Sequence, residues 1–291
     1  MKRRDFVRYG SLAAGAAFVD MARFPHPLYA GSQKKYATDV ATLGRTGIQI
    51  SRMAQGTGTS GFGKSSNQIR FLGFTGLADL LRAGVDEGLA FWDLADGYGS
   101  HPHAKEALKT VKRDKVVIMT KTAASTEREM RADLDRYRQE IGVDTIDILL
   151  LHCMMDSDWP RKKQGAMAVL SEAKEKGIIR AHGTSCHTLG ALKTAAATDW
   201  VELDLARLNP IGAHMDADPK TVVSVLKEMK AKGKGIIGMK ILAQGDLRDK
   251  VDEALQYALA QDVLDCFTIG AENRVELRGL IGKIPAASVR G

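Results

Sequence analysis

The chain has 291 residues, 44% of them hydrophobic and 26% charged, which is enough to bury the core of one large domain or two smaller ones. Twenty-nine glycines against seven prolines, with no low-complexity tract, exclude collagen-like, mucin-like and disordered chains. The net charge of +7 does not indicate a nucleic-acid partner, because the basic residues beyond position 30 are interspersed with acids, as on a solvated surface.

The first residues have the order of an export signal. Paired arginines and an aromatic side chain lie within Met1-Lys2-Arg3-Arg4-Asp5-Phe6, and a weakly apolar segment follows from Tyr9 to Val19. This order resembles a twin-arginine signal, with a small residue near Ala30 for cleavage. It predicts a leader over residues 1–35, the twin-arginine export machinery as a partner, and a periplasmic location. A frayed basic tail is the alternative.

The next segments predict strands that alternate with helices. Leu43 to Ile50 places two short apolar pieces around a glycine-bounded turn, which indicates a small hairpin. Short apolar runs of the kind that is buried on both faces then recur eight times. These runs are Met53–Gly56, Leu89–Leu94, Lys115–Thr120, Ile146–His152, Ala181–Ser185, Leu203–Leu208, Gly235–Lys240 and Cys266–Gly270.

Between the runs, apolar residues recur at helical spacing, as in Leu77, Leu80, Leu81 and Val85. Eight such alternations over residues 36–291 predict an α/β fold, a (β/α)8 TIM barrel with an N-terminal β-hairpin. An open doubly wound sheet is the alternative, but the glycines of residues 56–61 lack the spacing of a dinucleotide loop and predict a flexible loop. No apolar stretch is long enough to span a membrane.

Four polar side chains fall at the ends of neighbouring predicted strands: Asp93, Tyr98, Lys121 and His152. The site of such a barrel lies at the carboxyl ends of its strands, so we expect the four to converge. A buried lysine needs a counter-charge, which Asp93 can supply. The ammonium should lower the pKa of Tyr98 from its ordinary value of about 10 and make it a general acid. The alternative is that each group is satisfied separately.

Several short motifs resemble the aldo-keto reductase family. They are Leu43-Gly44-Arg45-Thr46-Gly47, Asp93-x-Ala95-x-x-Tyr98-Gly99, Met119-Thr120-Lys121, Leu149-Leu150-Leu151-His152 and Gly183-x-Ser185, with Asn209-Pro210 and Met239-Lys240 agreeing more weakly. The resemblance covers Thr42 to Ile281. It implies an NAD(P)H-dependent enzyme that reduces a small aldehyde or ketone. Hydride would come from the nicotinamide and the proton from Tyr98, whose pKa Lys121 and Asp93 tune while His152 orients the carbonyl.

The resemblance also implies a set of cofactor-binding residues. These are Gly56, Thr57, Asp93, Ser185, Lys240 and Arg274. Arg274 suits a 2′-phosphate and favours NADP, whereas Glu272 suits a ribose hydroxyl and favours NAD; we expect NADP, with NAD as the alternative. The chain ends soon after the last predicted helix, which predicts a shallow, open substrate pocket.

Three positions depart from the family pattern around the nicotinamide carboxamide. Cys186 stands where asparagine is expected, Leu205 where glutamine is expected and Met239 where many members have a stacking tyrosine. A carboxamide with fewer partners is held less firmly. This favours an alternative function, a nicotinamide-binding sensor or scaffold with little turnover.

A metal-dependent hydrolase on the same barrel is a further alternative, suggested by His101, His103, His152, His182 and His187. Metal ligands of barrels lie at strand tips, whereas His101 and His103 follow Tyr98 in a loop, so we expect no metal. The three cysteines are too few for a disulfide framework, and we expect Cys153 and Cys186 to be buried.

Overall fold

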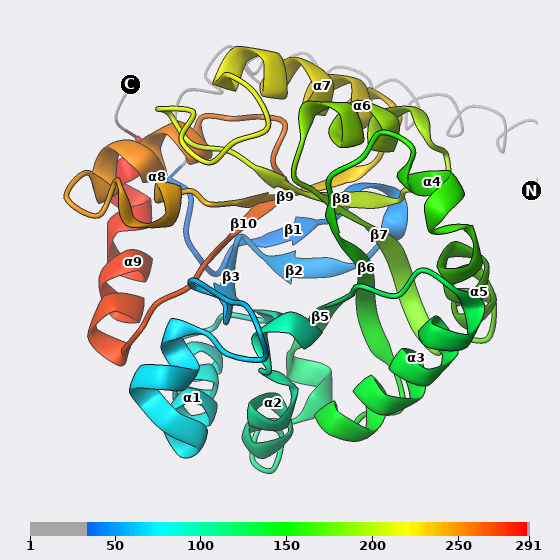
Figure 1. Ribbon diagram of the computed structural model, residues 1–291. Helices are drawn as coiled ribbons and strands as arrows, with labels where there is room; N and C mark the ends of the chain where they lie inside the picture. The colour runs from blue at the N-terminus through cyan, green and yellow to red at the C-terminus, as the bar shows by residue number, and fades with distance from the viewer. Residues whose placement is uncertain (1–33, 290–291) are drawn as a thin grey trace, which may run out of the picture. The chain divides into compact units, whose positions relative to one another are not determined.

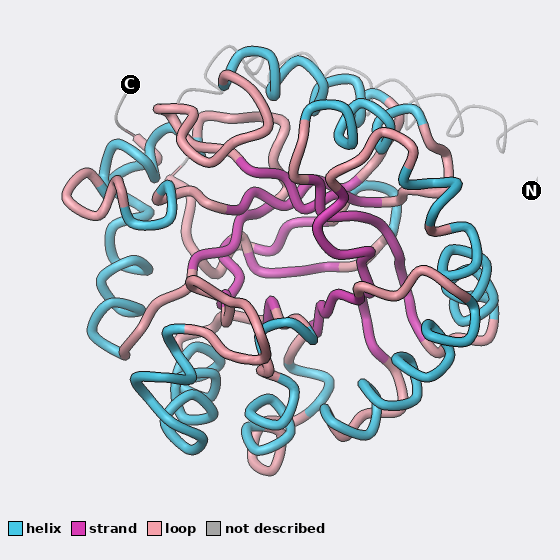
Figure 2. Tube along the Cα trace, viewed as in Figure 1, coloured by secondary structure: helices cyan, strands magenta, loops and turns pink. Residues whose placement is uncertain are grey.

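The computed structural model describes residues 34–289, so the predicted leader lies outside the described residues except at its last two positions. Figure 1 shows the strands closed into a central barrel, and Figure 2 shows the helices arranged around them. The predicted (β/α)8 barrel with an N-terminal hairpin is confirmed. Among the described residues, no helix is long and apolar enough to cross a membrane.

The hairpin consists of β1 (Val40–Thr42) and β2 (Gln49–Ser51), which pair antiparallel. The barrel strands follow in parallel, and β10 pairs with both β3 and β9, which closes the sheet. They are β3 (Met53–Gly56), β4 (Phe91–Asp93), β5 (Val117–Thr122), β6 (Ile146–Met154), β7 (Ile179–Cys186), β8 (Leu203–Arg207), β9 (Gly235–Met239) and β10 (Cys266–Ile269).

The helices follow the strands in turn, and the connection after β6 carries two of them. They are α1 (Asn67–Asp86), α2 (His101–Ala107), α3 (Glu127–Ile141), α4 (Trp159–Lys162), α5 (Gln164–Glu175), α6 (Leu189–Ala197), α7 (Pro219–Ala231), α8 (Val251–Leu259) and α9 (Arg274–Ala287). Side-chain caps mark the start of several of them: Thr126, for example, forms a reciprocal capping box with Glu129 at the start of α3.

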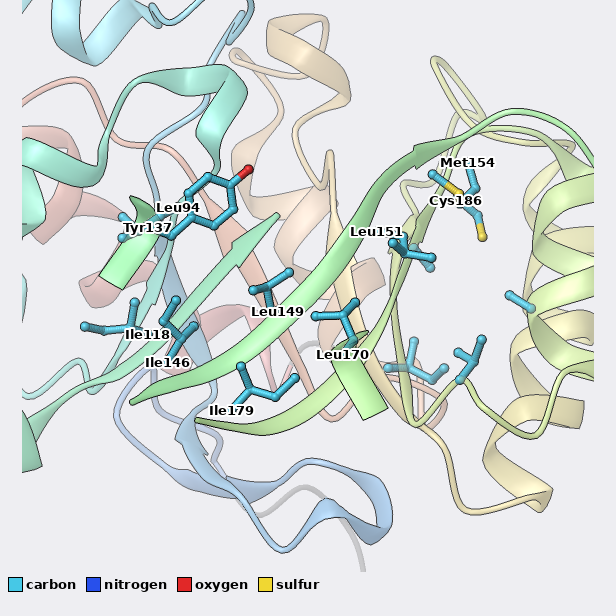
Figure 3. Packing of buried hydrophobic residues seen from close by; sticks show 14 of the residues in the cluster. Leu94, Ile118, Tyr137, Ile146, Leu149, Leu151, Met154, Leu170, Ile179 and Cys186 are labelled. Atoms are coloured by element: carbon cyan, nitrogen blue, oxygen red, sulfur yellow. The ribbon is translucent and has the colours of Figure 1, made fainter. Parts of the chain in front are cut away.

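The core has two layers, separated by the barrel wall. Along β6, Ile148 and Leu150 belong to the cluster inside the barrel, whereas Leu149 and Leu151 belong to the cluster under the helices (Figure 3). Alternate residues of one strand therefore enter different apolar layers. This accounts for the continuous apolar runs of the sequence.

The hairpin closes the amino-terminal end of the barrel. Leu43, Ile48 and Ile50 are almost fully buried and share a cluster with the interior residues Ala54 and Phe91. The backbone N–H of Leu43 donates to the carbonyl of Ile48 over 2.9 Å, which fixes the turn. The opposite end of the barrel, where the strands finish, carries the polar residues.

Candidate active site

The barrel mouth is lined by the last inward-facing residue of each strand. Strand alternation, anchored by the interior cluster, identifies this layer. Its members are Gly56, Asp93, Lys121, His152, Ser185, Arg207, Met239 and Thr268. The layer contains three of the four predicted catalytic residues, and the fourth, Tyr98, lies in the short helical turn η2 (Asp96–Tyr98) after β4.

Lys121 and Asp93 form a buried ion pair in this layer. The Lys121 side chain is fully buried, and its ammonium donates to Asp93 Oδ1 and, over 2.8 Å, to the carbonyl of Leu94. Thr268 Oγ1 donates to the other carboxylate oxygen over 2.9 Å. Burial lowers the pKa of Lys121, but Asp93 and Tyr98 outweigh it and raise that pKa above its ordinary value. The ammonium therefore keeps its charge.

Tyr98 is close to both this pair and His152. The Lys121 Nζ atom is 4.8 Å from the centre of the phenol ring. The imidazole of His152 meets the same ring edge-on, with ring centres 5.6 Å apart. Burial raises the pKa of Tyr98, Lys121 lowers it and Asp93 raises it, and the net pKa is above its ordinary value. The expected net lowering is therefore wrong, because burial outweighs the ammonium.

The loop after β3 encloses the Tyr98 ring. A Cβ atom at Gly58 or Gly61 would overlap the ring, at 2.5 Å from Cδ1 in the case of Gly61. The backbone N–H of Lys64 in the same loop donates to the carbonyl of Gly97 over 2.8 Å. These glycines permit close packing against the phenol, so the expectation of a flexible loop is replaced by a packed one.

His152 holds a neutral imidazole. Burial, Lys121 and the nearby His187 lower the pKa of His152 to about 3. His187 follows β7 directly, and burial together with Arg207, Lys240 and Lys121 lowers its pKa to about 4. The sequence analysis considered His187 only as a metal ligand. Its position shortly after a predicted strand could have indicated that it lies at the barrel mouth.

Three predicted cofactor residues have structural partners in the mouth. Thr57 Oγ1 bonds to the carbonyl of Asp93 over 2.9 Å and to Ser100 Oγ over 3.0 Å. Ser185 Oγ accepts the backbone N–H of Cys153 over 2.9 Å. Gly56 allows Thr268 to approach, since a Cβ there would lie 2.9 Å from Thr268 Oγ1. Although it is bonded to Cys153, Ser185 faces the inside of the barrel at the mouth.

Arg207 and Lys240 add positive charge to the mouth. Arg207 is opposite Met239 in the β8–β9 register and is paired with Asp216, Nε to Oδ1 over 3.0 Å. Lys240 is half-buried, has a left-handed backbone with φ of 56°, and makes no ion pair within the described part of the chain. Sequence reasoning missed Arg207, although a charged residue at the end of an apolar run was the signal.

The departures from the family pattern lie where the sequence suggested. Leu205 and Met239 both belong to the apolar cluster inside the barrel. Cys186 points into the helix layer, where its sulfur is 3.8 Å from Thr184 Oγ1, and it is buried as expected (Figure 3). Cys153 is exposed, so the expectation of its burial is wrong, because a left-handed residue at this point breaks the strand alternation.

The histidines of the metal alternative do not gather in one place. His101 and His103 are buried on α2, and His182 stacks on Trp200 with ring centres 4.2 Å apart. Across residues 34–289, one group of three candidate ligands comes within 4.8 Å, formed by Asp96, His101 and Glu140. The guanidinium of Arg136 already pairs with both acids of that group.

The model of the aldo/keto reductase family matches residues 55–278. The chain belongs to this family. A D-threo-aldose 1-dehydrogenase from a Pseudomonas species is 24% identical over 64% of this chain and 66% of that protein. An NADH-specific methylglyoxal reductase from Escherichia coli K12 is 29% identical over 49% and 50%, so the matches span about two thirds and half of these relatives.

Solved structures of the family share the fold. A protein described as an aldo-keto reductase from Pseudomonas aeruginosa superposes with a TM-score of 0.71 and 21% identity, over 88% of this chain and 98% of that one. Aldo-keto reductase AKR11C1 from Bacillus halodurans, in its holo form, has a TM-score of 0.68 and 16% identity, over 87% and 91%. These similarities show the fold, and the family model over residues 55–278 identifies the chain as an aldo/keto reductase family enzyme.

The residues present suit the phosphate groups of a nicotinamide dinucleotide better than its carboxamide. Lys240 directly follows β9, and the exposed Arg274 begins α9 after β10, the strand that pairs with β9; neither cation has an acidic partner in the described chain. Leu205 and Met239 offer the carboxamide no hydrogen bond. Glu272 is held by Asn67, whose amide donates to it over 2.6 Å.

Proposed function

We propose that this family member reduces a small aldehyde or ketone to an alcohol with NAD(P)H. The observation that carries the proposal is the buried Lys121–Asp93 pair beside the Tyr98 phenol, with the neutral His152 ring in contact with the same phenol. A nicotinamide, when bound, supplies the hydride. Every other step falls to the side chains of the mouth.

Tyr98 is the proton donor in this proposal. Its raised pKa keeps the phenol protonated at neutral pH, so a proton is ready for the oxygen of the carbonyl as hydride reaches the carbon. Lys121 stabilises the phenolate that remains, because its ammonium is 4.8 Å from the ring centre and stays charged. His152, being neutral, donates one hydrogen bond that orients the carbonyl oxygen.

The cofactor proposal uses the six residues named from the sequence. Lys240 and Arg274 would bind phosphates, Ser185 would face the nicotinamide, and Gly56, Thr57 and Asp93 would shape the wall beside it. Arg274 favours NADP, since its guanidinium is exposed at the start of α9 with one long bond of 3.4 Å to the carbonyl of Asp79. Arg274→Met should then raise the KM for NADPH about tenfold and that for NADH much less.

The decisive experiment is Tyr98→Phe, assayed with NADPH and NADH. Methylglyoxal with the reduced cofactors and aldoses with NAD⁺ or NADP⁺, in the oxidising direction, are the first assays to run, because the named relatives are a methylglyoxal reductase and an aldose dehydrogenase. Loss of the proton donor should lower kcat by about 10²- to 10⁴-fold while the cofactor still quenches protein fluorescence. An unchanged rate would overturn the role of Tyr98.

A sensor or scaffold with little turnover is the second candidate, favoured by Leu205 and Met239 beside the expected nicotinamide. It predicts tight nucleotide binding and no turnover in the unmutated protein.

We also propose export through the twin-arginine route with residues 1–35 as leader, which rests on the order of Arg3, Arg4 and Phe6. Lysines in place of both arginines should then keep the protein in the cytoplasm.

A further inference from the structure

A polar network lies outside the barrel wall, behind the proposed site. It begins at Asp96, two residues before Tyr98 in the turn η2. Asp96 Oδ1 accepts from Arg136 Nη1 over 2.7 Å and also pairs with Lys64 of the loop that encloses the phenol. Burial raises the pKa of Asp96, but the two cations lower it below its ordinary value, so the carboxylate stays charged.

Arg136 is the centre of the network. It lies on α3 and donates to three carboxylates: Asp96, Asp133 over 2.7 Å and Glu140 over 3.0 Å. The guanidinium also covers the ring of Tyr137, with Cζ 4.7 Å from the ring centre. A planar group with five donors can serve three acceptors at once, which a lysine ammonium does less well.

The network reaches both neighbours of Lys121. Asp133 accepts from Thr122 Oγ1 over 2.6 Å. Glu140 bonds to His101 Nδ1 over 2.8 Å, and His101 Nε2 bonds to Thr120 Oγ1 over 2.6 Å.

Lys121 faces the mouth of the barrel, whereas the residues on either side of it face the helices because side chains alternate along β5. The network thus holds the strand that carries the ammonium and the turn that carries the phenol.

We propose that Arg136 is a positioning residue that holds Tyr98 against Lys121. The expected effect on kcat rests on the proposed function, whereas the positioning of Tyr98 by Arg136 does not depend on it. Within residues 34–289, Arg136 is the one side chain that hydrogen-bonds to both branches, since Asp96 leads to the phenol while Asp133 and Glu140 lead to the strand of Lys121. A displacement of about 1 Å between reacting groups costs on the order of 10²-fold in rate.

The test compares Arg136→Met with Arg131→Met. Arg131 lies on the same helix and pairs with Glu172 over 2.6 Å, so its replacement also removes one α3 ion pair but leaves Asp96 untouched. Arg136→Met should lower kcat by about 10- to 100-fold with the KM for the cofactor unchanged. Arg136→Lys should recover part of the rate, and Arg131→Met should keep all of it.

A second variant and a second readout separate positioning from folding. Asp96→Asn keeps the shape of the side chain, removes the charged contacts of the Tyr98 turn with Arg136 and Lys64, leaves the bonds of Arg136 to Asp133 and Glu140, and should reproduce the fall in kcat. Phenolate absorbance, measured against Tyr98→Phe, follows the ionisation of Tyr98 without turnover. A loosened turn in Arg136→Met or Asp96→Asn reduces both the burial that raises the pKa of Tyr98 and the Lys121 contact that lowers it. Because burial is the larger effect, the pKa of Tyr98 should fall.

The outcomes distinguish this inference from the proposed function. If the unmutated protein reduces no carbonyl but the phenol still titrates lower in Arg136→Met, the proposed function fails and the positioning role stands. If the pKa of Tyr98 is the same in Arg136→Met, Asp96→Asn and Arg131→Met, the positioning role is overturned whatever the activity.

Discussion

The two side chains proposed to contact the carbonyl oxygen, Tyr98 and His152, are in opposite protonation states. Burial leaves Tyr98 protonated and His152 unprotonated, because each loses the solvation of its charged form. Lys121 keeps its charge because Asp93 and Tyr98 outweigh the effect of its burial. The groups that line the reaction are therefore fixed in one state across the neutral range.

This fixed state predicts a flat pH profile for carbonyl reduction. The pKa of His152 is lowered to about 3, so the imidazole stays neutral at every pH above that value, and Tyr98 stays protonated below its raised pKa. The kcat/KM for reduction should be constant between about pH 5 and pH 8. An inflection near pH 6.5 that vanishes in His152→Gln would contradict the assignment.

At the scale of elements, the strands could be predicted from the sequence, but the side-chain hydrogen bonds between distant strands could not. Continuous apolar runs indicate strands that pack on both faces, and polar residues at their ends indicate a mouth. Thr268 bonds to Asp93 from 175 positions away, which no local pattern encodes. The predicted strand Lys115–Thr120 ends too early, since β5 continues to Thr122 and carries Lys121 within it.

The loop after β3 was similarly out of reach of sequence reasoning. Glycine spacing alone permits a flexible loop, a phosphate loop or a loop that packs against a ring. Only tertiary packing distinguishes them, because the partner of Gly58 and Gly61 is Tyr98, which the chain reaches after α1. The four catalytic candidates were found because each interrupts or follows an apolar run.

Close packing of this loop makes a sharp prediction for Gly61→Ala. The new Cβ would lie 2.5 Å from Tyr98 Cδ1, so the ring or the loop must shift and the packing around the phenol must change. We expect kcat to fall by about tenfold or more, with cofactor affinity retained. Gly279→Ala on α9 is the control, since a Cβ there meets nothing within 4 Å. Equal rates in both variants would contradict the packing argument.

At the scale of the whole molecule, one buried acid opposes folding. Asp204 on β8 is fully buried between the barrel wall and the helices, where Thr184 Oγ1 bonds to Oδ1 over 2.6 Å and Oδ2 has no partner. Burial raises the pKa of Asp204 from 3.8 to about 7. Unfolding releases this proton, so stability falls as the pH rises from about 4 to about 7.

Asp204→Asn should remove this pH dependence. The amide cannot ionise, so the variant should be more stable than the unmutated protein at pH 8, with a ceiling of about 4 kcal/mol, and the difference should shrink at pH 5. Urea denaturation across that range measures it. Exposed Asp249→Asn is the control, and a gain for Asp204→Asn that does not grow with pH would contradict the assignment.

The sealed floor of the barrel has a kinetic consequence. Leu43, Ile48 and Ile50 fill the amino-terminal end, and the interior above them is packed with side chains. In the proposed reduction, bulk water would then return a proton to the phenolate through the mouth, by which the alcohol would also leave, and not through the closed end. Product release would precede reprotonation of Tyr98, and a bulky alcohol that leaves slowly would delay the next turnover.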